Sequence, residues 1–316
     1  MRNPLTALDK PALFAAGSIL LILAVGSLYT LSTGGGLTML SPAYLSQQLQ
    51  IAAFLGLIAG GLMMVILLGH IDLSIPWTLT AAAMMATSVG GPAAVPVALA
   101  VGLAVGVVNG LGVAWLRVPS MIFTLGVNTV LQGLMVLHTG GHAPQSRSTG
   151  LMEFLATGHV LGLPMAALVW AAVSGLLVVL LTRTAMGRAV YAIGNRESAA
   201  YLSGIPTNRV IVGCFAICGA CAALAGCLLA GYSTKAYQGM GNAYLLPGIA
   251  AVVIGGTHVL GGRGTYTGTV LGTILIVVLQ SVLSVMQMPD AGRQIIYGLV
   301  IIAMLFAYGR DTGRAG

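Results

Sequence analysis

Long apolar runs alternate with short polar stretches along the whole chain. A helix needs roughly 20 consecutive apolar residues to cross about 30 Å of hydrocarbon, and these runs have that length. They lack the short alternating pattern of a membrane barrel. The pattern therefore predicts about ten transmembrane helices, which cover approximately residues 12–32, 45–68, 74–90, 92–115, 121–139, 163–182, 210–231, 248–260, 267–287 and 293–308.

The polar pattern predicts a broken helix near 69–76. Asp72 follows the second run without a true loop, and a carboxylate near lipid costs a few kcal/mol unless it faces a cavity or a partner. Asp72 and Ser74 can cap a helix that begins near Pro76. Alternatively, they form the polar end of a broken helix that lines a pathway. Both interpretations remain open at this point.

A second break is predicted near 247–264. The apolar part of this segment is short for a span and is flanked by Gly255 and Gly256 on one side and by further glycines beyond. Short, glycine-interrupted segments are typical of half-helices buried beside a translocation path.

The composition indicates that most of the chain is surrounded by lipid and not by water. Charged residues make up 6% of the 316 residues, against about a quarter in soluble domains, and the mean hydropathy is +0.99. This charge is too sparse for a water-facing surface. We therefore predict an all-α polytopic membrane protein in which residues 1–316 form one transmembrane domain embedded in the lipid bilayer.

The basic residues predict the orientation. With an internal N-terminus and ten spans, three of the 13 Lys and Arg residues fall outside (Arg147, Lys235 and Arg293) and the rest inside. Cytoplasmic loops carry such an excess. We expect a multi-pass protein of the bacterial inner membrane with both termini in the cytoplasm, a periplasmic loop at 139–162 and a cytoplasmic loop at 183–209. The net charge of +7 therefore implies no nucleic-acid partner.

The loop at 183–209 predicts a short surface helix. Asn195 can cap it, Glu197 suits its first turn, and Gly204 and Pro206 end it. Such a helix is either an ordinary amphipathic connector or a docking element for a cytoplasmic partner.

Groups for energy coupling or catalysis are missing from the sequence. It has no phosphate-binding G-x-x-x-x-G-K-[ST] motif, no zinc-binding H-E-x-x-H motif and few ionisable groups in its spans. We predict a non-enzymatic protein without cofactor, metal or catalytic residues. Four cysteines lie on the seventh run, and we favour packing over a metal or redox site for them. They are Cys214, Cys218, Cys221 and Cys227.

Four distinctive stretches follow one another along the chain: IDLS at 71–74, VNG at 108–110 with LRVPSMIFTLG at 116–126, AIGNRESAA at 192–200 with LSGI at 202–205, and IAAVVIGG at 249–256 with GGRG at 261–264. Together they resemble the membrane permease subunits of bacterial ATP-binding-cassette importers, in the ribose, xylose and autoinducer-2 branch. The resemblance implies separate ATPase subunits, a second permease that is identical or a paralogue, and a periplasmic sugar-binding protein.

The resemblance also implies roles for residues. The cytoplasmic loop would couple to the ATPase through Gly194, Asn195, Arg196, Glu197, Ser198, Ala199, Ala200, Leu202 and Gly204. We expect the translocation pathway to include His70, Asp72, Ser74, Asn109, Thr124, Asn128, Gly255 and Gly256.

Two departures leave the cargo open. His70 stands where the family usually has Gly, and YLLP at 244–247 replaces the usual acidic Y-E-L-D. A monosaccharide or related sugar or polyol is the leading expectation. One alternative is a permease for nucleosides or branched-chain amino acids. The other is a stand-alone secondary transporter. Coupling such a transporter to protons would require more buried carboxylates than these spans offer.

Overall fold

The computed structural model describes residues 10–142, 144–289, 291–296, 298–299 and 302. It is a helical bundle, and the predicted all-α polytopic class is confirmed. Within the described residues, seven helices are long and apolar enough to cross a membrane. They are α1 (Lys10–Ser32), α2 (Pro42–Ile66), α4 (Ala94–Ala114), α5 (Ser120–His138), α7 (Met165–Arg183), α10 (Thr207–Tyr232) and α12 (Tyr266–Val285).

Two further apolar helices are short, and the sequence predicted this for the second of them. α3 (Ile75–Val89) has 15 residues and α11 (Leu245–Ile254) has 10. Each is joined to its neighbour by a non-helical stretch: residues 67–74 lie between α2 and α3 (the first break), and residues 255–265 lie between α11 and α12 (the second break). The tenth predicted span, 293–308, falls mostly outside the described residues.

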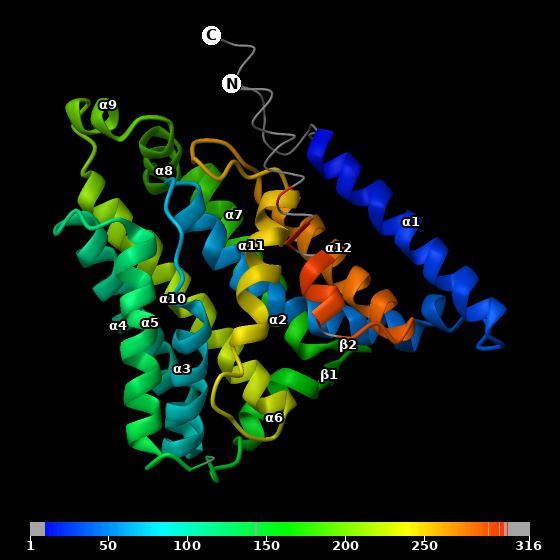
Figure 1. Cartoon of the computed structure of the whole chain (residues 1–316). Helices are drawn as coiled ribbons and strands as arrows, with labels where there is room; N and C mark the ends of the chain where they lie inside the picture. Colours follow the sequence, from blue (N-terminus) through cyan, green and yellow to red (C-terminus); the bar gives the residue numbers. More distant parts are fainter. Residues whose placement is uncertain (1–9, 143, 290, 297, 300–301, 303–316) are drawn as a thin grey trace.

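The remaining elements lie at the ends of the bundle. α8 (Ala185–Asn195) and α9 (Glu197–Leu202) occupy one end, and α6 (Gly150–Thr157) occupies the other (Figure 1). Near α6, β1 (His159–Val160) pairs antiparallel with β2 (Leu163–Pro164). There are also three short 3-10 helices, η1 (Thr38–Leu40), η2 (Gly91–Ala93) and η3 (Asn242–Tyr244). The described residues at 291–296, 298–299 and 302 are helical as well.

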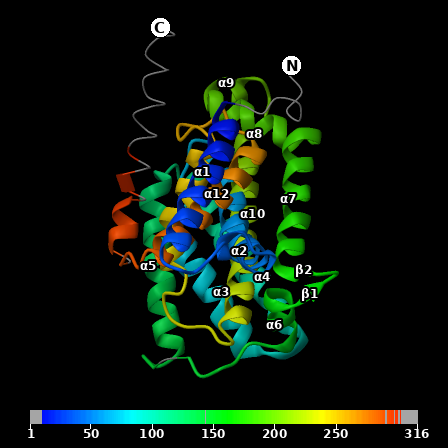
Figure 2. The same cartoon turned by 90° about the vertical axis from the view of Figure 1, so that its right-hand side faces the viewer.

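The core is built around α2 and α10. The apolar window of α2 is 89% buried, against 22% for α1, which packs on α12 at the edge of the bundle (Figure 2). α10 lies so close to α4 that a Cβ added at Gly102 or Gly106 would collide with the α10 backbone. Small residues permit such contact where no hydrophobic force drives helices together.

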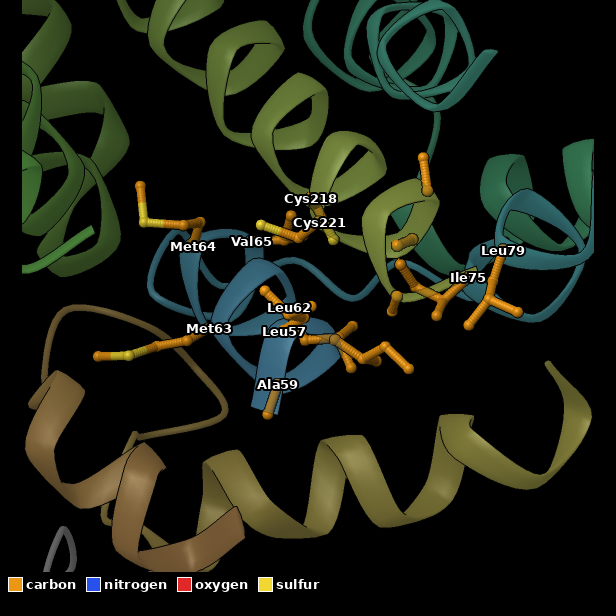
Figure 3. Packing of buried hydrophobic residues seen from close by; sticks show 14 of the residues in the cluster. Leu57, Ala59, Leu62, Met63, Met64, Val65, Ile75, Leu79, Cys218 and Cys221 are labelled. Carbon is orange, nitrogen blue, oxygen red and sulfur yellow. The ribbon is translucent and has the colours of Figure 1, made fainter. Parts of the chain in front are cut away.

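The four cysteines are buried on α10. Cys218 and Cys221 pack against Gly61 of α2, where an added Cβ would collide with them, and Figure 3 shows both close to Val65. Their surroundings are those of residues that pack two helices together.

Two predicted caps are wrong in detail. α9 begins at Glu197, so Arg196 is its N-cap, and Asn195 is the last residue of α8. The Asn195 side chain instead donates to Tyr191 O at 2.8 Å. Likewise, Ser74 is the N-cap of α3 and its side chain caps no backbone group. In both cases the polar side chain has a tertiary or local partner that competes with the helix end.

Candidate functional site

The two breaks meet at the end of the bundle where α8 ends. The Gly262 N–H donates to the Leu67 carbonyl at 2.9 Å, and Gly69 lies against the Leu260 carbonyl. Gly69 and Gly262 have φ values of 80° and 76°, which L side chains rarely adopt. The glycines that interrupt both apolar runs therefore shape one contact between the two breaks.

Gly194, near the end of α8, fits into this contact. A Cβ there would overlap the Leu67 carbonyl and the Gly262 amide. The neighbouring Asn195 donates to the Gly262 carbonyl at 3.4 Å, and the Tyr191 hydroxyl donates to the Gly264 carbonyl at 2.9 Å. The end of α8 thus touches both breaks, and we call residues 67–74, 191–195 and 261–264 the junction.

One side chain links α9 to the helices below it. Arg117, in the loop between α4 and α5, forms an ion pair with Glu197 at 2.5 Å and donates to Asn208 of α10 at 3.2 Å. Exposed ion pairs contribute about 0–1 kcal/mol to stability, and these side chains are 57% and 35% exposed. The pair therefore connects three elements without stabilising them strongly.

A cavity of about 600 Å³ lies beside this ion pair. Its lining includes Gly69, His70, Ile71, Arg117, Glu197 and Leu260. His70 lies beyond the end of α2, outside the helical spans. Burial lowers the pKa of His70, while Glu197 raises it and Arg117 lowers it, both to a smaller extent.

Three side chains of α5, spaced four residues apart, accept hydrogen bonds from backbone N–H groups in or next to the first break. The pairs are Ser120 Oγ with the Ile71 N–H (3.3 Å), Thr124 Oγ1 with the Leu73 N–H (2.9 Å) and Asn128 Oδ1 with the Trp77 N–H (3.4 Å). Buried backbone groups that lack helix partners must be satisfied elsewhere, above all in a membrane. This stripe of α5 therefore allows the chain to leave the helical path.

Asp72 is enclosed next to the stripe, with 1% of its surface exposed. Its Oδ1 accepts from the Ser74 amide at 2.9 Å, the Ser74 hydroxyl at 2.6 Å and Asn109 Nδ2 at 3.4 Å. Asn109 Nδ2 also donates to Ser74 Oγ at 2.7 Å. This network, which we call the Asp72 cluster, joins the first break to α4.

The structure brings most of the predicted pathway residues together. Asp72, Ser74 and Asn109 form the Asp72 cluster, Thr124 and Asn128 belong to the stripe of α5, and His70 lines the cavity. Gly255 packs on Gly268 of α12, and Gly256 has a φ of 90°.

Sequence reasoning missed Arg117 and Ser120 as partners of this region. Both lie inside the recognised stretch LRVPSMIFTLG at 116–126, and this was the available signal. It did not show that α9 and the first break lie within reach of that loop.

Comparison with known proteins identifies the family. A family model described as "Branched-chain amino acid transport system / permease component" matches residues 44–305. The chain belongs to this family. It is thus a multi-pass membrane permease, which is a transport component.

Individual relatives agree. The ribose import permease protein RbsC of Bacillus subtilis (strain 168) is 37% identical over 83% of this chain and 84% of the relative. RbsC of Haemophilus influenzae is 32% identical over 79% and 80%. The autoinducer 2 import system permease protein LsrC of Salmonella typhimurium is 32% identical over 82% and 76%. No solved structure matches the chain.

Proposed function

We propose that this chain is the membrane-spanning subunit of an ATP-binding-cassette importer for a monosaccharide or a related sugar or polyol. Separate ATPase subunits hydrolyse the ATP. The names of the ribose and autoinducer 2 import permeases support this cargo class. The observation that carries the coupling role is the junction, where the end of α8, directly before α9, contacts both breaks in the helical bundle.

The exposed side of α9 is the docking surface for the ATPase in this proposal. Tyr201 and Leu202 are 66% and 84% exposed, whereas Ala200 is buried against the bundle. Large apolar side chains on the surface of a water-facing loop are typical of an interaction site. The predicted coupling residues at 194–204 therefore supply both a surface for a partner and a connection inward.

Movement of α9 has two routes into the bundle. Glu197 acts on Arg117 and hence on the start of α5, whose stripe holds the first break. Gly194 acts on Leu67 and Gly262, one in each break. Two breaks that pack against each other can adopt two discrete arrangements, because a packed interface switches between states and does not deform continuously. ATP binding would thereby be converted into alternating access.

The proposal includes the assembly and its orientation. Residues 1–316 form one transmembrane domain, which pairs with a second permease of the same or a paralogous sequence and receives cargo from a periplasmic binding protein. The α8–α9 end faces the cytoplasm of a bacterial inner membrane, together with both termini. The Lys and Arg residues at 183–209 support this orientation.

Uptake into reconstituted vesicles tests the proposal. The permease is assembled with its ATPase and binding protein, and labelled D-ribose and L-leucine are compared with and without ATP. We expect ATP-dependent ribose accumulation. Leucine uptake instead would favour the amino-acid cargo that the family description names. Accumulation against a gradient by the chain alone would overturn the proposal.

A further inference from the structure

A polar cleft lies between the first part of α2, the second half of α12 and the start of α11. Two adjoining cavities of about 350 and 310 Å³ form it, and they share Ile51, Val277, Gln280 and Arg293. α12 begins at the junction, and Gln280 lies near its other end, so the cleft is distant from the junction along α12 (Figure 1).

Amide and hydroxyl groups dominate the polar side of this cleft. Gln280 faces the larger cavity together with Asn242 and Gln294, and Gln47 and Gln48 face the smaller one. Arg293 is the charged residue in both linings. The Tyr44 hydroxyl donates to Ser281 Oγ at 2.7 Å across the gap between α2 and α12.

These amides have no structural partner comparable to those of the Asp72 cluster. Gln280 lies inside the apolar span Tyr266–Val285, where a polar side chain is expensive unless it faces protein, water or a ligand. Within the described residues, the side chains of Gln280, Gln47 and Gln48 form no hydrogen bond. Among the described residues, packing therefore supplies no polar partner for these amides.

We propose that the polar cleft is a contact site for the transported solute, a neutral polyhydroxylated molecule of monosaccharide size. A primary amide both donates and accepts hydrogen bonds, as does a sugar hydroxyl, and the guanidinium adds further donors. Cavities of roughly 300–1,000 Å³ are usual for small-molecule sites, and both cavities of the cleft lie at the lower end of this range. This assignment depends on the proposed function, since it places sugar contacts in the outer half of the importer.

Thiol labelling tests the site directly. The variant Gln280→Cys is made in the otherwise wild-type chain, whose own cysteines are buried, and the full importer in vesicles is treated with a membrane-impermeant methanethiosulfonate. We expect modification, with a rate that D-ribose lowers several-fold and L-leucine does not. The matched control is Leu176→Cys on α7, which is 66% exposed on an apolar face and should remain unmodified.

Each other outcome overturns the assignment. An unmodified Gln280→Cys means that lipid or a second copy of the chain covers the cleft. Protection by leucine alone, or by neither solute, means that the cleft does not bind sugar. Labelling that depends on anionic lipid but not on ribose assigns Arg293 to a headgroup. Ribose uptake by the same vesicles reports separately on the proposed function.

A second variant measures transport. In Gln280→Leu the amide is lost, and we expect ribose uptake to fall about tenfold, the effect of one lost hydrogen bond of good geometry, while the ATPase activity of the complex persists. The control Gln132→Leu removes an exposed amide of α5 that lines neither cavity and should transport normally. Equal uptake by both variants would refute the site, whereas unchanged ATP dependence would leave the proposed function intact.

Discussion

The junction and the polar cleft are both polar regions inside one apolar bundle, but they are built in opposite ways. At the junction, polar side chains and glycines contact backbone groups of the same chain. Thr124 accepts a hydrogen bond from the Leu73 N–H, and Gly194 packs against the Leu67 carbonyl. In the polar cleft, amides such as Gln280 border an open volume. Polarity at the junction therefore serves the fold, whereas polarity in the cleft is available to a ligand.

This contrast gives a criterion for buried polar residues in membrane proteins. Where a helix is interrupted, the released N–H and C=O groups account for nearby hydroxyls and amides. Where the helix is continuous, as in α12 around Gln280, the backbone groups bond to one another, so they do not account for a nearby polar side chain. Substitutions should accordingly lower stability at the junction and alter transport alone in the cleft.

The largest effect is expected at Gly194. In Gly194→Ala the added methyl group would overlap backbone atoms of both breaks, and overpacking of this kind costs about 1–3 kcal/mol or more. We expect a clearly lower Tm in detergent and loss of uptake. Gly175→Ala on α7 is the control, because its Cβ would meet no atom within 4 Å. Equal Tm values for the two variants would remove the junction as a tight contact.

Asp72 ranks next. In Asp72→Ala, the Ser74 amide and Asn109 lose their shared acceptor, and each unsatisfied buried group costs about 1–3 kcal/mol. We expect a lower free energy of unfolding in denaturant titration, with Asp72→Asn intermediate because it keeps one oxygen. Gln280→Ala should unfold as the wild type does. If Asp72→Ala keeps full stability but loses uptake, the Asp72 cluster serves transport rather than the fold.

A smaller effect is expected for the stripe of α5. Thr124→Val removes the acceptor for the Leu73 N–H, with an expected loss of about 1–2 kcal/mol. Thr129→Val, whose hydroxyl is exposed and bonds only within its own helix, is the matched control and should change little. Hydrogen exchange at the Leu73 amide provides the measurement. Unchanged protection there would show that Thr124 does not hold the break.

The smallest stability effect belongs to the Arg117–Glu197 pair. Glu197→Gln should shift the free energy of unfolding by less than about 1 kcal/mol, because the pair is largely exposed. Uptake should nevertheless fall while ATP hydrolysis continues, since the link to α5 is cut. The exchanged pair Arg117→Glu with Glu197→Arg should restore part of the uptake. Normal uptake by Glu197→Gln would exclude this route.

Local sequence information sufficed for several features. The apolar runs, the positions of both breaks and the surface helix near 197–202 all depend on hydrophobicity, glycine and helix-end chemistry within short windows. The family could also be recognised, because its stretches are contiguous. Asn195 shows where such reasoning fails: a good capping residue bonds to Tyr191 and Gly262 instead, and its tertiary partner lies 67 residues away.

The sequence by itself determined that this chain is a helical membrane protein with two interrupted helices, since the length of an apolar run and the presence of glycine or Asp within it are local properties with direct energetic consequences in lipid. Only the tertiary structure decided that the breaks touch each other, that Gly194 lies between them and that Gln280 borders a cavity. Those facts depend on which helices pack together, and the nearly uniform apolarity of the spans leaves their neighbours unspecified until close packing of glycines and paired hydrogen bonds select them.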